Sequence, residues 1–302
     1  MTWVFVALLS AAVSGLVNLF DKTVIYRYAH TPYTLPLMIG LSQSLVGAVI
    51  LLTQPVPDEA TLSAVAWGLG SGALFGLSAQ FLMRMLYSQE VSRTVPVFQT
   101  FPIYTALIAV FFLGDSISPL QWLAIIATVS GAVMLSLRID RQYRRLFLHY
   151  SFFVLMTGSF ISATAHITAS LAVADLPVLY AHGLRMLALG AVFIVANVRP
   201  SSIREVTGFF RSRSPAVGLV AVNEIVTANI GMFLMLWALS MGPVALVTTL
   251  IGTRSFFVVL YSTVIALIWR GFLGEQTSRG AVTMKVACTA LIVAGIAGVT
   301  IR

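Results

Sequence analysis

The sequence has few charged residues and only one cysteine. Of its 302 residues, 9% are Asp, Glu, Lys or Arg, against about 25% in an ordinary soluble domain, while 59% are apolar. With a mean hydropathy of +0.96, this composition excludes a soluble globular protein and an intrinsically disordered chain. Cys288 has no second cysteine to pair with, which excludes an internal disulfide scaffold.

Signatures of enzymes are also missing. The sequence has no phosphate-binding P-loop, so transport driven by ATP within this chain alone is excluded. His166 and His182 lack the neighbouring carboxylate or cysteine spacing of a metal site. We therefore expect no enzyme, no cofactor and no bound metal. A net charge of +8 would suggest nucleic acid in a soluble protein, but in a membrane protein the positions of the charges matter more, and no nucleic-acid partner is expected.

Long apolar runs dominate the sequence. A bilayer core of about 30 Å takes about 20 helical residues to cross, and runs of about this length leave little sequence between them. The runs are continuous and do not alternate, which excludes a β-barrel. The first is read as a retained helix because no cleavage site follows it. The sequence thus predicts an all-α integral membrane protein with ten transmembrane helices, at about 3–20, 36–53, 62–86, 95–113, 120–137, 150–173, 176–196, 216–239, 244–268 and 281–301.

The basic residues are strongly biased toward one set of connections. With ten spans, the odd-numbered connections carry 14 lysines and arginines, and the even-numbered connections and termini carry only Arg302. Basic connections are retained in the cytoplasm, so the odd connections should be cytoplasmic and both termini outside, in a cell (inner) membrane. The 14 are Lys22, Arg27, Arg84, Arg93, Arg138, Arg141, Arg144, Arg145, Arg199, Arg204, Arg211, Arg213, Arg270 and Arg279.

The two halves of the chain resemble each other. At an offset of 143, Gly40 and Gly47 fall on Gly183 and Gly190, and further matches occur at 152 (Phe81-Leu82-Met83) and 160 (Leu113-Gly114-Asp115). Residues 1–146 and 147–302 are therefore predicted to be two copies of a five-helix unit. Because five is odd, the second copy enters the membrane from the opposite face. Inverted repeats of this kind are typical of secondary transporters, with the site near the midplane between the halves.

Several segments resemble the drug/metabolite transporter superfamily in its EamA form. They are 91–104 with its Pro-Val-Phe-Gln-Thr-Phe-Pro core, Phe112-Leu113-Gly114-Asp115 with Gln121-Trp122 and Gly131, Leu273-Gly274-Glu275 with Lys285 and Gly295, and Asn18-Leu19-Phe20-Asp21-Lys22. The resemblance implies a multi-pass transporter over essentially the whole chain. Similar proteins usually place both termini in the cytoplasm. The superfamily includes relatives of reversed orientation, and the prediction here follows the charges.

Ionisable residues inside the spans are candidates for the transport site, because an isolated charge there is costly. Arg254 and Arg185 lie ~14–15 Å deep by helical rise, and Glu224 ~12 Å deep. The two guanidinium groups suit a carboxylate or phosphate. Glu224 is the candidate for proton coupling, with His166 as a possible relay. The alternatives are a structural ion pair between Arg185 and Glu224, and close packing of the small residues around His166.

Uncharged polar residues give weaker signals. Asn223 and Thr227 flank Glu224 one turn apart and are expected to line the same cavity. Gln99 lies between Pro96 and Pro102, whose missing N–H groups free backbone carbonyls for a cavity or simply kink the helix. Tyr261 is one of several aromatic residues expected to wall the pocket, although such residues more often pack in the core.

The sequence therefore favours a secondary active transporter, an exporter of a small polar or amphipathic metabolite such as an amino acid or organic anion. It would work by alternating access, coupled to protons or another ion. The alternatives are a passive facilitator or exchanger on the same fold, and a non-transporting membrane subunit or lipid-handling partner. The expected partners are a small-molecule substrate, the coupling ion and the lipid bilayer. Oligomeric state is not readable from the sequence.

Overall fold

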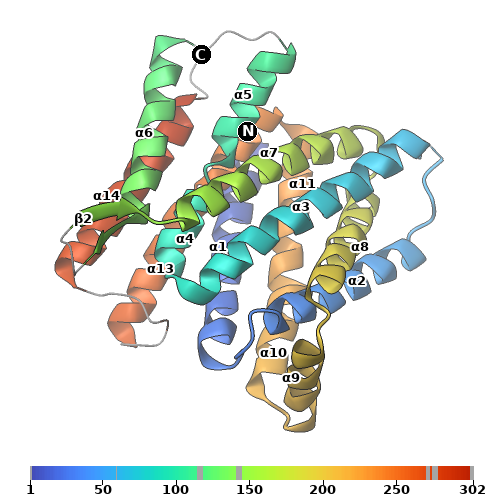
Figure 1. Ribbon diagram of the computed structural model, residues 1–302. Coiled ribbons are helices and arrows are strands. Elements are labelled where there is room, and N and C mark those ends of the chain that lie inside the picture. Colours follow the sequence, from blue (N-terminus) through green and yellow to red (C-terminus); the bar gives the residue numbers. More distant parts are fainter. Residues whose placement is uncertain are drawn as a thin grey trace.

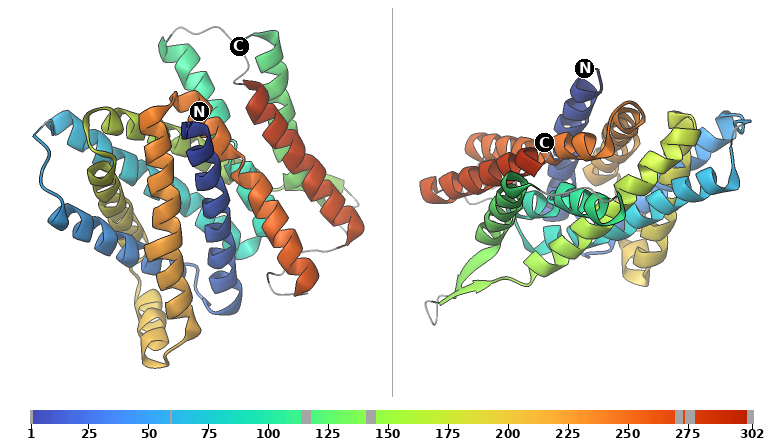
Figure 2. Two further views of the ribbon diagram at one scale, coloured as in Figure 1. Left: turned by 180° about the vertical axis from the view of Figure 1, so that it is seen from behind. Right: turned by 90° about the horizontal axis from the view of Figure 1, so that it is seen from above.

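The computed structural model describes residues 2–58, 60–113, 118–140, 145–269, 273 and 278–299. Figures 1 and 2 show an assembly of helices that cross at several angles. Both the start of the first helix and the end of the last lie toward the upper side in Figure 1. The predicted helical fold class is confirmed, apart from one short pair of strands that the sequence analysis treated as a connection.

The first half of the described chain forms α1 to α6. Their bounds are α1 Thr2–Arg27, α2 Thr34–Thr53, α3 Leu62–Ser88, α4 Val91–Phe98, α5 Phe101–Leu113 and α6 Pro119–Ser136. The second half begins after a hairpin. It comprises β1 Leu137–Asp140, β2 Arg145–Leu148, α7 Ser151–Asp175, α8 Val178–Asn197, α9 Pro200–Arg211, α10 Pro215–Ala221, the π-helix η1 Val222–Thr227, α11 Ala228–Met241, α12 Val244–Gly252, α13 Arg254–Ile268 and α14 Arg279–Val299.

Within the described residues, eight helical stretches are long and apolar enough to cross a membrane. Two of the predicted spans lie outside this set. One, predicted as 95–113, is divided into α4 and α5 at Gln99 and Thr100. The other contributes the apolar helix Trp122–Leu135 within α6. The first division has a direct cause: Pro102 has no N–H to bond the carbonyl one turn earlier, at Phe98.

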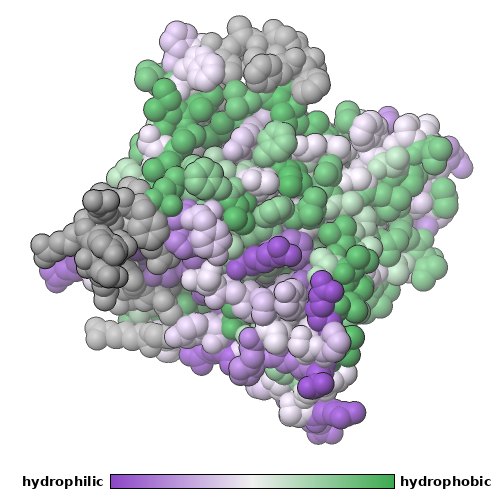
Figure 3. Space-filling view, viewed as in Figure 1, coloured by the Kyte–Doolittle hydropathy of each residue, from purple (hydrophilic) through white to green (hydrophobic). Residues whose placement is uncertain are grey.

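Two of the predicted connections contain secondary structure. In the first, β1 and β2 pair antiparallel with Leu137 opposite Leu148. In the second, α9 buries Ser202 and Val206 while Ile203 and Phe210 are exposed. Figure 3 shows polar residues gathered toward the bottom of the molecule, where α9 lies, and mostly apolar residues above. This division matches a polar membrane surface below an apolar span region.

The helices of the two halves pack closely on one another. The main contacts join α3 to α7, α2 to α8, α6 to α14, and α1 to α11 and α13. Glycines permit this approach. A Cβ at Gly72 of α3 would lie 2.2 Å from the carbonyl oxygen of Arg185 on α8, so no side chain fits there. Small residues at crossings are the usual means of helix packing in membranes, where lipid competes equally for apolar surface.

Candidate functional site

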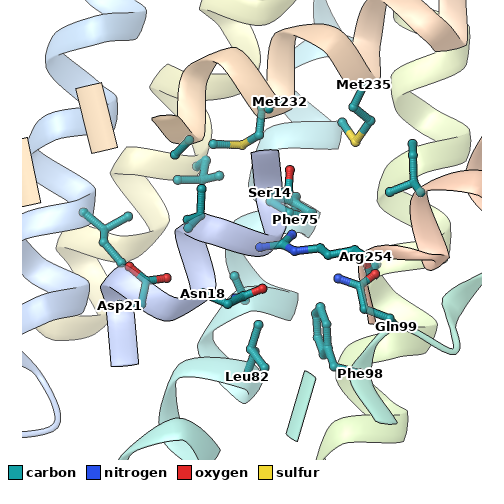
Figure 4. Close-up of a pocket in the computed structure, with 18 of the residues that line it drawn as sticks. Ser14, Asn18, Asp21, Phe75, Leu82, Phe98, Gln99, Met232, Met235 and Arg254 are labelled. Carbon is teal, nitrogen blue, oxygen red and sulfur yellow. The ribbon is translucent and has the colours of Figure 1, made fainter. Parts of the chain in front are cut away.

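A partly open cavity lies between helices of both halves, with about 860 Å³ of empty space when the part open to its surroundings is counted. Figure 4 shows residues of its wall. Much of the wall is apolar and polarisable, from Phe75, Phe98, Phe101, Met232 and Met235. Its polar members are Ser10, Ser14, Asn18, Asp21, Gln43, Gln99, Ser162, His166, Glu224 and Arg254. A largely apolar pocket with a few convergent polar groups is typical of a site for a small amphipathic ligand.

Arg254 lines this cavity and begins α13. The apolar stretch predicted as 244–268 is interrupted at Thr253, where the amide N of Thr253 bonds the carbonyl of Leu250 at 3.1 Å. Figure 4 shows the Arg254 side chain reaching across the cavity toward Asn18, with Gln99 beside it. Among the described residues, no carboxylate lies within ion-pair distance of its guanidinium, and its Nε has no hydrogen-bond partner. The group is therefore available to an anion.

Gln99 lies in the division between α4 and α5 and also lines the cavity. Its Oε1 is buried without a hydrogen-bond partner. Arg254 and Gln99 thus occupy similar places, each at an interruption of a helix and each directed to the same cavity. Interrupted helices at the midplane are a recurring feature of transporter binding sites because they expose backbone and side-chain groups together.

Glu224 lines the cavity beside a second carboxylate, Asp21 of α1. One amide nitrogen, Nδ2 of Asn223, donates to Glu224 Oε1 at 2.8 Å and to Asp21 Oδ1 at 2.9 Å. Both carboxylates are almost fully buried, with 3% and 2% of their surface exposed. Two negative charges so close in a low-dielectric site repel one another. The proton-coupling role of Glu224 stays a prediction, and this second carboxylate supports it.

The geometry around Glu224 differs from the prediction that Asn223 and Thr227 line one cavity. Asn223 does not line it but bridges the two carboxylates, and the Thr227 hydroxyl bonds the Val222 carbonyl at 3.3 Å, away from the cavity. The cause is the π-helix. Its wider turn joins residue i to i+5, so residues four apart no longer share a face.

Tyr261 is also placed away from the cavity. It lies two turns beyond Arg254 on α13, where its ring packs against Phe257 and against Gly15 of α1. A Cβ at Gly15 would lie 3.3 Å from the ring. Tyr261 therefore packs between helices, as aromatic residues more often do, and does not form part of the cavity wall as predicted.

Arg185 forms no ion pair with Glu224, so the alternative of a structural ion pair between these two residues is wrong. It is fully buried, its Nη1 donates to the Ala165 carbonyl at 3.3 Å, and its guanidinium lies 4.7 Å from the centre of the Phe75 ring. The acceptor positions of Glu224 are instead used by Asn223 and Gln43. Arg185 therefore lies behind the cavity wall, with Phe75 in between.

His166 lines the cavity and stacks beside Phe101 at 4.6 Å between ring centres. Its Nε2 lies 3.5 Å from the Ser162 hydroxyl one turn earlier, and its Nδ1 has no hydrogen-bond partner. The packing expected around His166 is present, because α7 packs tightly on α3. The imidazole also faces the cavity, and its role as a proton relay stays a prediction.

Three residues that line the cavity were not among the predicted site residues: Asn18, Asp21 and Gln43. The first helix was predicted to end near residue 20, which assigned Asp21 and Lys22 to a connection. The structure continues α1 to Arg27 and buries both side chains. Asn18 and Asp21 are three residues apart, and this helical spacing just inside a helix end was the available signal.

Comparisons with known proteins bear on the fold and family of the chain. A family model described as the EamA-like transporter family matches residues 1–137. This match assigns residues 1–137 to that family. Together with the apolar helices, it supports a multi-pass membrane transporter of the drug/metabolite type. No curated protein matches the sequence.

Solved structures also resemble the EamA-like chain. Twenty-seven chains in solved structures match this chain. One of them is described only as the crystal structure of a protein, and it matches with a TM-score of 0.58 and 18% sequence identity. That comparison covers 99% of this chain and 95% of the other. At this identity the likeness is one of fold, and it extends over both halves.

Proposed function

We propose that this EamA-like protein is a secondary active exporter of a small amphipathic metabolite bearing a carboxylate, such as an amino acid or related organic anion. The observation that carries the proposal is the guanidinium of Arg254, which has no carboxylate within ion-pair distance among the described residues and lies in a cavity walled by aromatic and methionine side chains. Arginine offers paired donors that match a carboxylate, and the apolar wall accommodates the rest of the molecule.

Proton coupling is assigned to Glu224 together with its neighbour Asp21. The two carboxylates and Arg254 line one cavity, so a bound anion changes the charge that the pair experiences. Binding and protonation are then linked in both directions, because each alters the free energy of the other. This linkage is what a proton-coupled cycle needs.

Alternating access is proposed to arise from two inverted five-helix repeats, residues 1–146 and 147–302. Reciprocal contacts support this. A Cβ at Gly40 would lie 3.0 Å from the Gly190 carbonyl oxygen, and one at Gly47 2.8 Å from that of Gly183. At an offset of 143, Gly40 corresponds to Gly183 and Gly47 to Gly190, so Gly40 contacts the counterpart of Gly47 and Gly47 contacts the counterpart of Gly40. Reciprocal contact is the property of an interface with two-fold symmetry.

The pair α6 and α14 has the same property. A Cβ at Gly131 would meet Ile292, and one at Gly295 would meet Thr128. An offset of 164 places Gly131 on Gly295 and Thr128 on Ile292, so these two contacts are reciprocal. Following the charge bias, we propose that the odd connections face the cytoplasm, including the connection that contains α9. Labelling of a cysteine introduced at exposed Ser201, in inside-out and right-side-out vesicles, would test this orientation.

Transport of radiolabelled amino acids and organic acids into proteoliposomes, with and without a pH gradient, tests the coupling. We expect the gradient to drive accumulation by wild type, and Glu224→Gln to lose the gradient dependence while still exchanging substrate. Transport that ignores the pH gradient and is unchanged in Glu224→Gln would refute coupling through this residue.

A thermal-shift screen of the purified protein tests the anion site. Ligands with a carboxylate should raise the melting temperature of wild type, Arg254→Lys should bind them more weakly, and Arg254→Ala should not respond. Thr253→Val is the matched control, because the Thr253 hydroxyl bonds only the Leu250 carbonyl one turn earlier, at 2.6 Å. If every stabilising ligand acts equally on Arg254→Ala, the carboxylate proposal is wrong.

A further inference from the structure

A continuous chain of buried hydrogen bonds leads from α8 to the candidate coupling carboxylate. The Nε2 of His182 lies 3.0 Å from Asn229 Oδ1, and Asn229 Nδ2 lies 3.1 Å from Gln43 Oε1. Gln43 Nε2 then lies 3.0 Å from Glu224 Oε2. The chain joins α8 and α11 of the second half to α2 of the first. All four side chains are buried.

The chain has a single direction. An amide oxygen only accepts and an amide N–H only donates, so His182 must donate through Nε2–H to Asn229. Asn229 in turn donates to Gln43, and Gln43 donates to Glu224. Asn229 also donates to the Glu224 backbone carbonyl, as does Gln43. If the Asn229 amide were turned over, its oxygen would face Gln43 Oε1 and the Glu224 backbone carbonyl oxygen. The N–H that His182 donates therefore favours the orientation in which Asn229 and Gln43 present N–H groups to Glu224.

His182 is outside the cavity wall, as is Asn229. The other face of the His182 ring packs edge-on against Phe233, with 5.9 Å between ring centres. Its Nδ1 is buried and has no hydrogen-bond partner. His182 is therefore committed to one polar contact, and this contact leads to Glu224.

We propose that His182 is a positioning residue for the coupling site: through Asn229 and Gln43 it orients the N–H groups that receive the Glu224 carboxylate, without touching the substrate. The inference rests on the proposed coupling role of Glu224. It adds a residue from α8 to a site built from α1, α2 and η1, and it links movement of α8 to the environment of the carboxylate.

Few other ionisable groups face Glu224. From α1, Asp21 shares the Asn223 amide, whereas Lys22 directs its ammonium to the Leu86 and Gln89 carbonyls at 2.6 Å. The helices α2, α10 and α11 contain no ionisable residue. Arg254 and His166 line the same cavity from α13 and α7, and Arg185 lies on α8 behind Phe75. A shift in the titration midpoint of Glu224 after substitution of His182 alone can therefore be distinguished from a shift caused by a change in one of these charged residues.

Infrared difference spectroscopy on proteoliposomes, titrated with pH, tests the inference without any substrate. The carboxyl band absent from Glu224→Gln identifies Glu224. In His182→Leu we expect its titration midpoint to rise by roughly half a pH unit, because donors that favour the ionised carboxylate lose their orientation. His182→Gln, which can still donate an N–H, should restore a midpoint near that of wild type.

Asn229→Leu removes the acceptor of the same hydrogen bond and provides a second route if His182→Leu does not fold. It should move the midpoint in the same direction, and the double variant should add little to either single change. The control is Gln80→Leu. This variant removes a buried hydrogen bond of similar length, 3.1 Å from Asn197 Nδ2 on α8 to Gln80 Oε1, which is not connected to Glu224.

The results separate this inference from the proposed function. An unchanged midpoint in both His182→Leu and Asn229→Leu would overturn the positioning role. An equal shift in Gln80→Leu would also overturn it, since general loosening of α8 would then explain the effect. Transport that is indifferent to Glu224→Gln would instead refute the coupling proposal, whatever the infrared midpoints are.

Discussion

At the scale of single residues, the site is a small set of charges held in an apolar interior. Asp21 and Glu224 share the Asn223 amide, and Arg254 lines the same cavity. The arrangement separates an acidic cluster from a basic group within one space. A ligand bearing a carboxylate would therefore add a negative charge beside Arg254 and alter the field at the acidic cluster.

The Asp21→Asn variant should lower the titration midpoint of Glu224. Removing a neighbouring negative charge makes ionisation of the remaining carboxyl easier, which is opposite in sign to the expected effect of His182→Leu. The same infrared titration measures it, with Ser14→Ala as a control at another wall position of α1. A midpoint that rises in Asp21→Asn would show that Asp21 acts on Glu224 mainly as a hydrogen-bond partner.

At the scale of helices, interruptions and close crossings carry the architecture. The breaks before α5 and α13 place Gln99 and Arg254 at the cavity, and η1 turns Glu224 toward Asp21. The α3 and α8 crossing is close enough that Gly72 touches the backbone at Arg185. This crossing also supports the placement of Phe75, one turn later on α3, between Arg185 and the cavity.

The Gly72→Ala variant should lower the stability of the protein markedly. The added Cβ would lie 2.2 Å from the Arg185 carbonyl oxygen, so the helices must separate. Overpacking of this kind typically costs about 1–3 kcal/mol. Heating with a thiol-reactive fluorophore reports unfolding through Cys288, the single cysteine, which is buried.

Gly70→Ala is the matched control on the same helix. A Cβ there meets nothing within 4 Å, so its melting temperature should be unchanged or slightly higher, since alanine favours a helix over glycine. Equal melting temperatures for Gly72→Ala and Gly70→Ala would contradict the close crossing of α3 and α8.

At the scale of the whole molecule, polar contacts join the halves on the side that carries the basic connections. Glu90 at the start of α4 lies 2.5 Å from the Lys285 ammonium of α14. Glu205 of α9 accepts hydrogen bonds from the backbone N–H groups of His30 and Thr31, at 2.7 and 3.2 Å, and from the Thr34 hydroxyl. These contacts connect the two halves outside the cavity, where an alternating-access movement would have to change them.

Glu205 gives a pH dependence to stability. Partial burial opposes its ionisation, but the hydrogen bonds from Thr34, His30 and Thr31 outweigh burial and hold its pKa below the usual value. The ionised group therefore stabilises the folded state above the ordinary carboxyl pKa of about 4.3, and this contribution is lost as pH falls through the lower folded value.

Melting temperatures of wild type and Glu205→Gln should thus differ at neutral pH and converge below about pH 4, where both side chains are neutral. Thermal melts followed by far-ultraviolet circular dichroism measure both proteins across this range. Glu205 lies on α9, outside the predicted spans and away from the cavity, so substrate binding should change little. A difference that stays constant with pH would contradict the assignment.

Much of the helical plan followed from the sequence because membrane insertion is a local requirement. Apolar length and proline positions predict where helices run, and the scarcity of intramembrane charge singled out Arg254 and Glu224. The partners of those charges were not predictable in this way. An ion pair between Arg185 and Glu224 was an alternative suggested by their similar depths, but depth does not specify which way a side chain points around its helix axis.

The sequence by itself determined that this chain is a helical membrane protein, with repeated glycines and a one-sided set of basic connections, because these properties depend on residue type and order. Only the tertiary structure decided that Asp21 joins Glu224, that Thr227 and Tyr261 leave the cavity, and that His182 belongs to the same hydrogen-bond chain. Those outcomes depend on a π-helical turn and on how helices distant in sequence cross, and both are set by packing over the whole molecule.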